Sequence, residues 1–249
     1  MSIPYKLAPQ IGTEGRIGLI VLQSDETMEH ELRQVLPDAD VGAFISRIPS
    51  AAKVSNESLA AMEADLPRAA GLLPKTVSFD AVGYGCTSAS SIIGTERVTE
   101  LVGTVLETKA VTNPVSALVS ACEALGISKL ALLTPYTEAV SESLRLALSA
   151  HGIDTPVFGT FNEPVETKVA RIDPTSVRDA AIELAQDKGA DAVFMSCTNL
   201  RTFSILKDVE NAIGKPALSS NQAFFWHMLG LAGTTSARRD GMLWDKSVN

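Results

Sequence analysis

One eight-residue motif occurs twice in this 249-residue chain, and this repeat constrains the fold more than any other feature. DAVGYGCT at 80–87 matches DAVFMSCT at 191–198, an offset of 111 residues. The apolar segment that starts at Arg16 has a counterpart that starts at Lys129, an offset of 113 residues. DAV before a buried strand is common in α/β folds, but two matching segments at a nearly constant offset predict a duplicated domain.

Apolar, β-rich segments alternate with amphipathic segments along the whole chain. Strands are expected over 16–22, 41–48, 79–84, 107–111, 128–133, 155–159, 190–196 and 215–219. Helices are expected over 27–36, 56–72, 91–105, 114–125, 137–151, 174–188, 202–213 and 221–232. Near-continuous apolar strands that alternate with helices are typical of parallel sheets covered on both faces. The chain is therefore predicted to be an α/β protein with two pseudo-symmetric Rossmann-like or flavodoxin-like domains.

The repeat also predicts where the domains meet. The first domain is expected to comprise 1–110 plus 215–249, and the second 111–214, because the second half otherwise has more elements than the first. Ligands in open α/β sheets bind at the carboxyl ends of the strands. Cys86 and Cys197 each follow a predicted strand. Two halves packed face to face would place both thiols in the cleft between the domains, which is the predicted active site.

The charge and cysteine content argue against several classes of protein. A formal net charge of -8 without a Lys/Arg cluster disfavours nucleic acid as a partner. The longest apolar runs are about half the roughly 20 residues of a membrane helix, and the N-terminus lacks the apolar core of a signal peptide. A cytoplasmic protein without a membrane partner is expected. Three cysteines do not fit a disulfide framework, and neither CxxC nor His spacing suggests a metal site.

The segments around the two predicted site cysteines suit a carboxylate ligand. A thiol at a helix N-terminus is expected to have a lowered pKa, because the helix dipole and nearby N–H groups stabilise the thiolate. Gly85–Ser91 is small and hydroxyl-rich, and it can surround a carboxylate with backbone amides and hydroxyls. From the opposite side, Thr198 and Asn199 can do the same. A small carboxylate is therefore the predicted substrate.

Two thiols that face one substrate permit two kinds of chemistry. One thiol can remove a proton from the carbon next to the carboxylate while the other delivers one. Alternatively, one thiolate adds to the substrate and the other thiol transfers the proton. Cys122 lies on the apolar face of a predicted helix and is expected to be a core residue.

Loops after other strands supply further candidates for substrate binding. Asp25 and Thr27 lie in the polar loop after the first predicted strand. Asp25 can contact substrate or cap the following helix. Asn113 precedes Pro114 and is a predicted helix cap, in a loop that also faces the cleft.

The cysteine motifs resemble those of a known superfamily. VFMSCTNLRTF at 193–203 resembles the second cysteine motif of the aspartate/glutamate racemase superfamily, and GYGCTSASS at 83–91 resembles the first. RIGLIVLQSDETME at 16–29 and LALLTPYTEAV at 130–140 are similar to its substrate loops. The resemblance covers nearly the whole chain. It is closest to the branch that holds maleate cis-trans isomerase and arylmalonate decarboxylase.

This resemblance implies two Rossmann-like domains, no cofactor, and a homodimer or higher homo-oligomer. It also implies a carboxylate held by backbone amides and hydroxyls at Thr87 and Ser88, with a hydroxyl from Tyr136. Maleate isomerases carry Asn in the first loop and after the sixth strand, where this chain has Asp25 and Glu166. Two acids would repel a second substrate carboxylate and favour an ammonium or hydroxyl group.

Two further comparisons with members of this branch narrow the predicted function. Arylmalonate decarboxylases lack the first cysteine, so Cys86 argues against decarboxylation by a single thiol. QSDETME at 23–29 is similar to the loop of a branch member associated with ectoine breakdown, whose substrate would carry an amine or acylated amine.

Several functions stay open. The favoured one is a cofactor-independent racemase or isomerase of an amino, acylamino or hydroxy acid, with Cys86 and Cys197 as acid and base or as nucleophile. A maleate-type cis-trans isomerase with a covalent Cys86 adduct is the alternative. A non-catalytic carboxylate-binding protein of two domains is a third possibility. A dithiol redox protein is a further one, but such proteins usually have both cysteines in one CxxC, whereas Cys86 and Cys197 are 111 residues apart.

Overall fold

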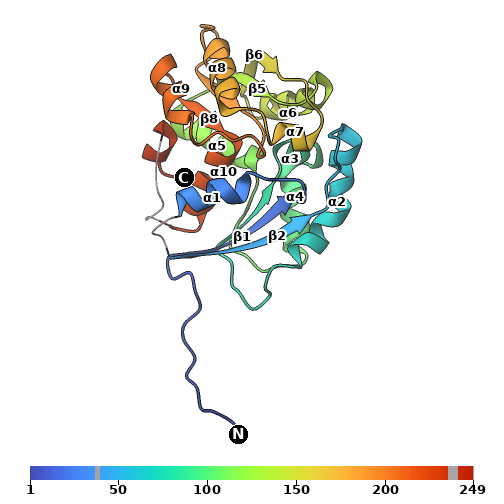
Figure 1. The fold of residues 1–249 in the computed structure, drawn as a ribbon, viewed down its shortest axis with the longest axis vertical. Helices are drawn as coiled ribbons and strands as arrows, with labels where there is room; N and C mark the ends of the chain where they lie inside the picture. Colours follow the sequence, from blue (N-terminus) through green and yellow to red (C-terminus); the bar gives the residue numbers. More distant parts are fainter. Residues whose placement is uncertain (37–39, 235–240, 249) are drawn as a thin grey trace.

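A computed structural model describes residues 1–249 apart from 37–39, 235–240 and 249, and it contains two four-stranded parallel sheets (Figure 1). The first sheet has the order β2-β1-β3-β4 and the second β6-β5-β7-β8. The strands are β1 (Gly15–Leu22), β2 (Val41–Ile48), β3 (Ala81–Gly85), β4 (Val111–Thr112), β5 (Lys129–Thr134), β6 (Asp154–Thr160), β7 (Ala192–Met195) and β8 (Ala217–Ser219). The two sheets repeat one topology, so the predicted α/β fold with two pseudo-symmetric halves is confirmed.

Helices surround both sheets, and residues 1–10 are exposed and extend away from them (Figure 1). The helices are α1 (Met28–Val35), α2 (Asn56–Ala70), α3 (Thr87–Ile93), α4 (Thr95–Gly103), α5 (Pro114–Leu125), α6 (Glu138–Ala150), α7 (Glu166–Val169), α8 (Pro174–Ala185), α9 (Leu206–Ile213), α10 (Ser220–Leu231) and the 3-10 helix η1 (Met242–Asp245). In the described part of the chain, no helix has the length and apolar content needed to cross a membrane.

The repeated Asp of the two motifs makes the same contact in each half. Asp80 accepts a hydrogen bond from the backbone N–H of Arg16 at 2.9 Å, and its own N–H donates to the Arg16 carbonyl at 2.8 Å. Asp191 accepts from the N–H of Lys129 at 2.9 Å and donates to its carbonyl at 2.8 Å. Each Asp therefore aligns the start of one central strand with the next, which explains why the motif and the first strands repeat at nearly the same offset.

Both faces of the central strands are buried, as expected for covered parallel sheets. On β1, Ile17, Leu19 and Val21 pack in one hydrophobic cluster, whereas Ile20 and Leu22 pack in the other. Each cluster also contains side chains of the second sheet. The two halves therefore share their hydrophobic cores.

The sheets depart from the expected boundaries at two places. Residues 111–112 form β4, which pairs with β3 in the first sheet, although the second domain was expected to begin at 111. Residues 217–219 form β8, which pairs with β7 in the second sheet, although 215–249 was expected in the first domain. The following helix, α10, returns to contact β3 and β1.

One expected helix is two helices in the structure. Residues 91–105 were expected to be continuous, but α3 ends at Ile93 and α4 starts at Thr95. Gly94 separates them with a φ of 93°, a backbone conformation that residues other than glycine rarely adopt. The first of the two helices, α3, begins directly after Cys86, so its first turn lies at the carboxyl end of β3.

Candidate active site

Cys86 lies at the junction between β3 and α3. It is the N-cap residue of α3, and its sulfur accepts a hydrogen bond from the backbone N–H of Ala89 at 3.4 Å. Both Gly85 and Ser88 beside it are buried. This strand-to-helix turn therefore points the thiol to the carboxyl edge of the first sheet, where the repeat predicted it.

Cys197 lies at the equivalent edge of the second sheet, directly after β7 and Ser196. Its φ of 151° is unusual for a residue with a side chain. Its N–H donates to the Ser220 hydroxyl at 3.0 Å, and its sulfur accepts from the N–H of Asn199 at 3.3 Å. Strained backbone of this kind persists where surrounding contacts hold it, and it is frequent at functional sites.

A buried group of three polar side chains surrounds the Cys197 sulfur. The Tyr136 hydroxyl lies 3.1 Å from this sulfur and donates to Glu166 Oε1 at 2.6 Å. Glu166 Oε2 accepts from the amide of Asn199 at 3.0 Å. Cys86, Tyr136 and Glu166 also line one small cavity. The structure therefore brings both predicted thiols and three predicted binding residues to one place.

Asp25 serves as a helix cap and also leaves one oxygen free. Its Oδ1 accepts from the N–H groups of Thr27 and Met28 at 2.8 and 2.7 Å. Its Oδ2 is buried and has no hydrogen-bond partner among the described residues. Burial raises the pKa of this carboxyl to about 6, and the negative charge of Glu166 adds to that rise. Such an oxygen can accept a hydrogen bond from a donor on a ligand.

The two site thiols do not have the lowered pKa that their positions predicted. Burial, together with the charges of Glu166 and Asp25, raises the pKa of Cys86 to about 12. Burial also raises the pKa of Cys197 well above its usual value, again with Glu166. The expectation was wrong because it counted the helix N–H groups, such as that of Ala89, without the desolvation and the two nearby carboxyls.

The remaining predicted residues have mixed roles. Asn113 is a cap, because its Oδ1 accepts from Val115 and Ser116 at 3.0 Å and its amide donates to Ser116. Thr27 donates its hydroxyl to the carbonyl of Asn199 at 3.0 Å, and it therefore joins the first loop to the Cys197 loop. Ser88 is buried beside Cys86.

Sequence reasoning missed two residues of the site. Ser220 accepts from Cys197 and lies 2.8 Å from the Thr87 hydroxyl, which donates to it. Glu31 accepts from the backbone N–H groups of Thr202 and Phe203 at 2.6 and 3.0 Å. The polar residues that follow the expected strand 215–219 were a signal for Ser220, because strand ends carry sites in this fold.

The cavity at the thiols is nearly closed. It holds about 10 Å³, which is room for about one water molecule. Ser50, Ala51, Val54 and Ser58 form its wall on the side of β2 and α2. A substrate larger than one water molecule therefore needs this cavity to widen.

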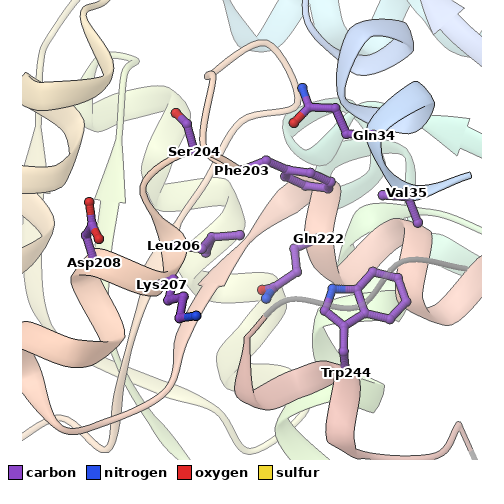
Figure 2. A pocket seen from close by; sticks show the side chains of 9 residues that line it. All are labelled: Gln34, Val35, Phe203, Ser204, Leu206, Lys207, Asp208, Gln222 and Trp244. Atoms are coloured by element: carbon purple, nitrogen blue, oxygen red, sulfur yellow. The ribbon is translucent and has the colours of Figure 1, made fainter. Parts of the chain in front are cut away.

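A larger cavity of about 300 Å³ lies elsewhere, between the end of α1, the start of α9 and η1 (Figure 2). Figure 2 shows Phe203, Gln222 and Trp244 around it. Its described lining includes neither site thiol, and the Gln222 amide is fully buried in its wall. Although this cavity is larger, it is not the candidate active site, because neither site thiol is among its described lining.

Comparisons with known proteins identify the family of the chain. The profile of the arylmalonate decarboxylase family matches residues 17–243. The arylmalonate decarboxylase of Bordetella bronchiseptica is 31% identical over 137 residues, which cover 53% of this chain and 56% of that protein. The maleate isomerase of Pseudomonas putida is 27% identical over 230 residues, which cover 86% of this chain and 90% of that protein.

A solved structure shows the same fold. A variant of the Nocardia farcinica maleate cis-trans isomerase, with a covalently bound succinylcysteine intermediate, superposes with a TM-score of 0.85. It is 26% identical, and the match covers 92% of this chain and 98% of that one. The chain therefore belongs to the arylmalonate decarboxylase family and is an enzyme of the branch of the aspartate/glutamate racemase superfamily that also holds the maleate isomerases.

Proposed function

We propose that the protein is a cofactor-independent isomerase, a racemase or epimerase of a small carboxylate that carries an amine, acylamine or hydroxyl group. The observation that carries this proposal is that Cys86 and Cys197 reach one buried cluster from equivalent strand ends of the two sheets. Thiols on opposite sides of a substrate carbon can remove and deliver a proton in one reaction.

The substrate carboxylate is proposed to bind between the two cysteine loops. Thr87, Ser88 and Thr198 are buried there and offer backbone N–H groups. Ser88 also offers a hydroxyl, whereas the hydroxyls of Thr87 and Thr198 already donate to Ser220 and to the Gly85 carbonyl. Two arginines contact the first loop and its helix, and both are already paired. Arg47 donates to the carbonyl oxygens of Leu22 and Asp25 and forms an ion pair with Glu29, and Arg171 forms an ion pair with Glu26. Dipoles rather than a side-chain cation would therefore stabilise the carboxylate.

The other end of the substrate is proposed to meet Asp25. Its buried Oδ2 lacks a partner among the described residues, and a buried acceptor without a donor is costly. An ammonium or hydroxyl group would supply that donor. A second carboxylate would instead face Asp25 and the charge of Glu166, which already raises the pKa of Asp25.

A maleate-type cis-trans isomerisation is the second candidate, and the succinylcysteine in the Nocardia farcinica structure favours it. In that reaction the Cys86 thiolate would add to one alkene carbon, and the Cys197 thiol would protonate the other. Rotation about the new single bond and reversal of both steps would then release the trans isomer.

The test is a panel of amino, acylamino, hydroxy and unsaturated acids incubated with the protein in heavy water. NMR and chiral chromatography would follow deuterium and configuration. We expect deuterium at the α-carbon together with loss of optical purity for one class of monocarboxylate. Conversion of maleate to fumarate would favour the second candidate. Ligand binding without turnover across the panel would contradict both and leave a carboxylate-binding protein.

A further inference from the structure

Cys197, Tyr136 and Glu166 form a continuous hydrogen-bond path that begins at the Cys197 sulfur. The Tyr136 hydroxyl lies 3.1 Å from the sulfur and donates its own proton to Glu166 Oε1 at 2.6 Å. Because the Tyr136 proton points to Glu166, the thiol proton of Cys197 can point to the Tyr136 oxygen. All three side chains are buried.

Both oxygens of Glu166 already have protein donors. Oε1 accepts from Tyr136 and Oε2 accepts from Asn199 at 3.0 Å. This differs from Asp25, whose Oδ2 has no partner among the described residues. In the part of the chain that the structure describes, Glu166 forms no ion pair. Its carboxylate is thus held toward Tyr136 rather than offered to the substrate.

We propose that Glu166 accepts the proton of Cys197 through Tyr136 whenever this sulfur acts as a thiolate. The S–H bond of Cys197 breaks as the Tyr136 oxygen takes that proton, and the original Tyr136 O–H bond breaks as Glu166 takes the second. The negative charge moves from the carboxylate to the sulfur, and no electron donor or acceptor is needed. The role of this proton transfer in catalysis rests on the proposed function, because the transfer ionises one of the two thiols that the proposed reaction uses.

The surroundings explain why such a relay is useful here. Among the described residues, four titratable groups interact with the charge of Glu166: Tyr136 and Cys197 from the second half, and Cys86 and Asp25 from the first. Burial raises the pKa of Glu166 and of Cys197. Loss of the thiol proton to solvent would leave two or three negative charges in one desolvated space. Transfer within the group keeps the total charge constant.

This relay makes a prediction that does not depend on turnover. A tautomer with a Cys197 thiolate and a protonated Glu166 carries as many protons as the resting state. Its population is therefore independent of pH between the pKa of Glu166 and that of Cys197. Alkylation of Cys197 by iodoacetamide, measured in a Cys86→Ser, Cys122→Ala background, should show a flat rate over that range.

Glu166→Gln removes the proton acceptor and should change the shape of this profile. Without the tautomer, the Cys197 thiol must lose its proton to solvent to become a thiolate, so the rate should fall about tenfold for each pH unit below the thiol pKa. Asp25→Asn removes the other nearby carboxyl without touching Tyr136, and it should keep the flat region. Tyr136→Phe removes the hydroxyl that contacts both groups, so it should lower the rate in the flat region without giving it a slope.

A tenfold slope per pH unit with Glu166 intact would overturn the relay, and so would a flat region that survives Glu166→Gln. With a substrate in hand, Glu166→Gln should also lower turnover by about a hundredfold or more. An alkylation profile with the flat region but no turnover on any acid would reject the proposed function and leave the relay standing.

Discussion

Thr87 and Thr198, the residues that follow the two site thiols, each reach across to the opposite half of the molecule. The Thr87 hydroxyl donates to Ser220 at 2.8 Å, and Ser220 accepts the N–H of Cys197. The Thr198 hydroxyl donates to the carbonyl of Gly85, next to Cys86, at 3.4 Å. Each cysteine loop therefore positions the other, and the two thiols form one site rather than two.

Ser220→Ala tests this mutual positioning. It leaves the buried N–H of Cys197 and the hydroxyl of Thr87 without partners, so unfolding free energy should fall by about 1–3 kcal/mol. Turnover should fall about tenfold to a hundredfold, because the strained Cys197 backbone loses a contact that holds it. Chemical denaturation and steady-state kinetics would measure both. Ser204→Ala, the same change at an exposed position, should shift stability by no more than about 0.5 kcal/mol. Unchanged kinetics in Ser220→Ala would contradict the role of this contact.

Glu31 joins α1 of the first half to the loop after Cys197. Its Oε1 accepts from Thr202 and Phe203, and its Oε2 accepts at 2.7 Å from Asn221, which also donates to the Thr198 carbonyl at 2.8 Å. Burial raises the pKa of Glu31 from 4.5 to about 7. Between pH 4.5 and about 7, Glu31 therefore holds a proton in the folded protein that it has lost in the unfolded chain. The free energy of unfolding falls as pH rises through this range.

The predicted size of this loss is at most about 3 kcal/mol, the free-energy equivalent of the pKa difference. In Glu31→Gln the loss of unfolding free energy between pH 4.5 and 7.5 should become smaller, with a remainder from Asp25, whose pKa is also raised. Urea unfolding at several pH values measures it. The exposed Glu107→Gln is the matched control and should keep the full pH dependence. A profile for Glu31→Gln identical to that of the unmodified protein would show that Glu31 does not titrate in this range.

Asp25→Asn tests the substrate class. Asn keeps the oxygen that accepts from Thr27 and Met28, but it replaces a charged acceptor with an amide that can donate to a carboxylate. Removal of the like charge should improve binding of dicarboxylates by roughly 1–4 kcal/mol, which is about one to three decades. The ratio of kcat/KM for maleate to that for the best monocarboxylate measures this shift. Efficient turnover of maleate by the unmodified protein would contradict the assigned preference.

Local patterns were enough to predict most of the fold. The expected strand 41–48 coincides with β2, and 16–22 lies within β1, because both are long and β-rich. The repeated motif predicted Cys86 and Cys197 at equivalent strand ends, since a strand followed at once by a helix is encoded in adjacent residues. The sheet that β8 joins could not be predicted this way, because it depends on pairing with β7 across the intervening α9.

The missed and misjudged features of the site depend on residues that are far apart in the chain. Ser220 contacts Cys197, and Glu31 contacts Thr202, through hydrogen bonds that no local pattern contains. The raised pKa of Cys86 likewise arises from burial and from the charges of Glu166 and Asp25, rather than from its own loop. The pKa of a buried group depends on all the charges and the solvent around it in the folded structure. The position of Cys86 at a helix N-terminus alone therefore predicted the wrong direction for its pKa shift.

The central claim is that both site thiols take part in the reaction. The most direct measurement is the rate of deuterium incorporation or isomerisation, on the best acid of the panel, in Cys86→Ser, Cys197→Ser and Cys122→Ala. A serine hydroxyl is far too weak an acid to replace a thiol, so each of the first two variants should lose about a hundredfold or more. Cys122 is buried in the core away from the strand ends, so Cys122→Ala should keep its activity and lose on the order of 1 kcal/mol of stability. If either serine variant folds normally and keeps more than about a tenth of the activity, the two-thiol account is wrong.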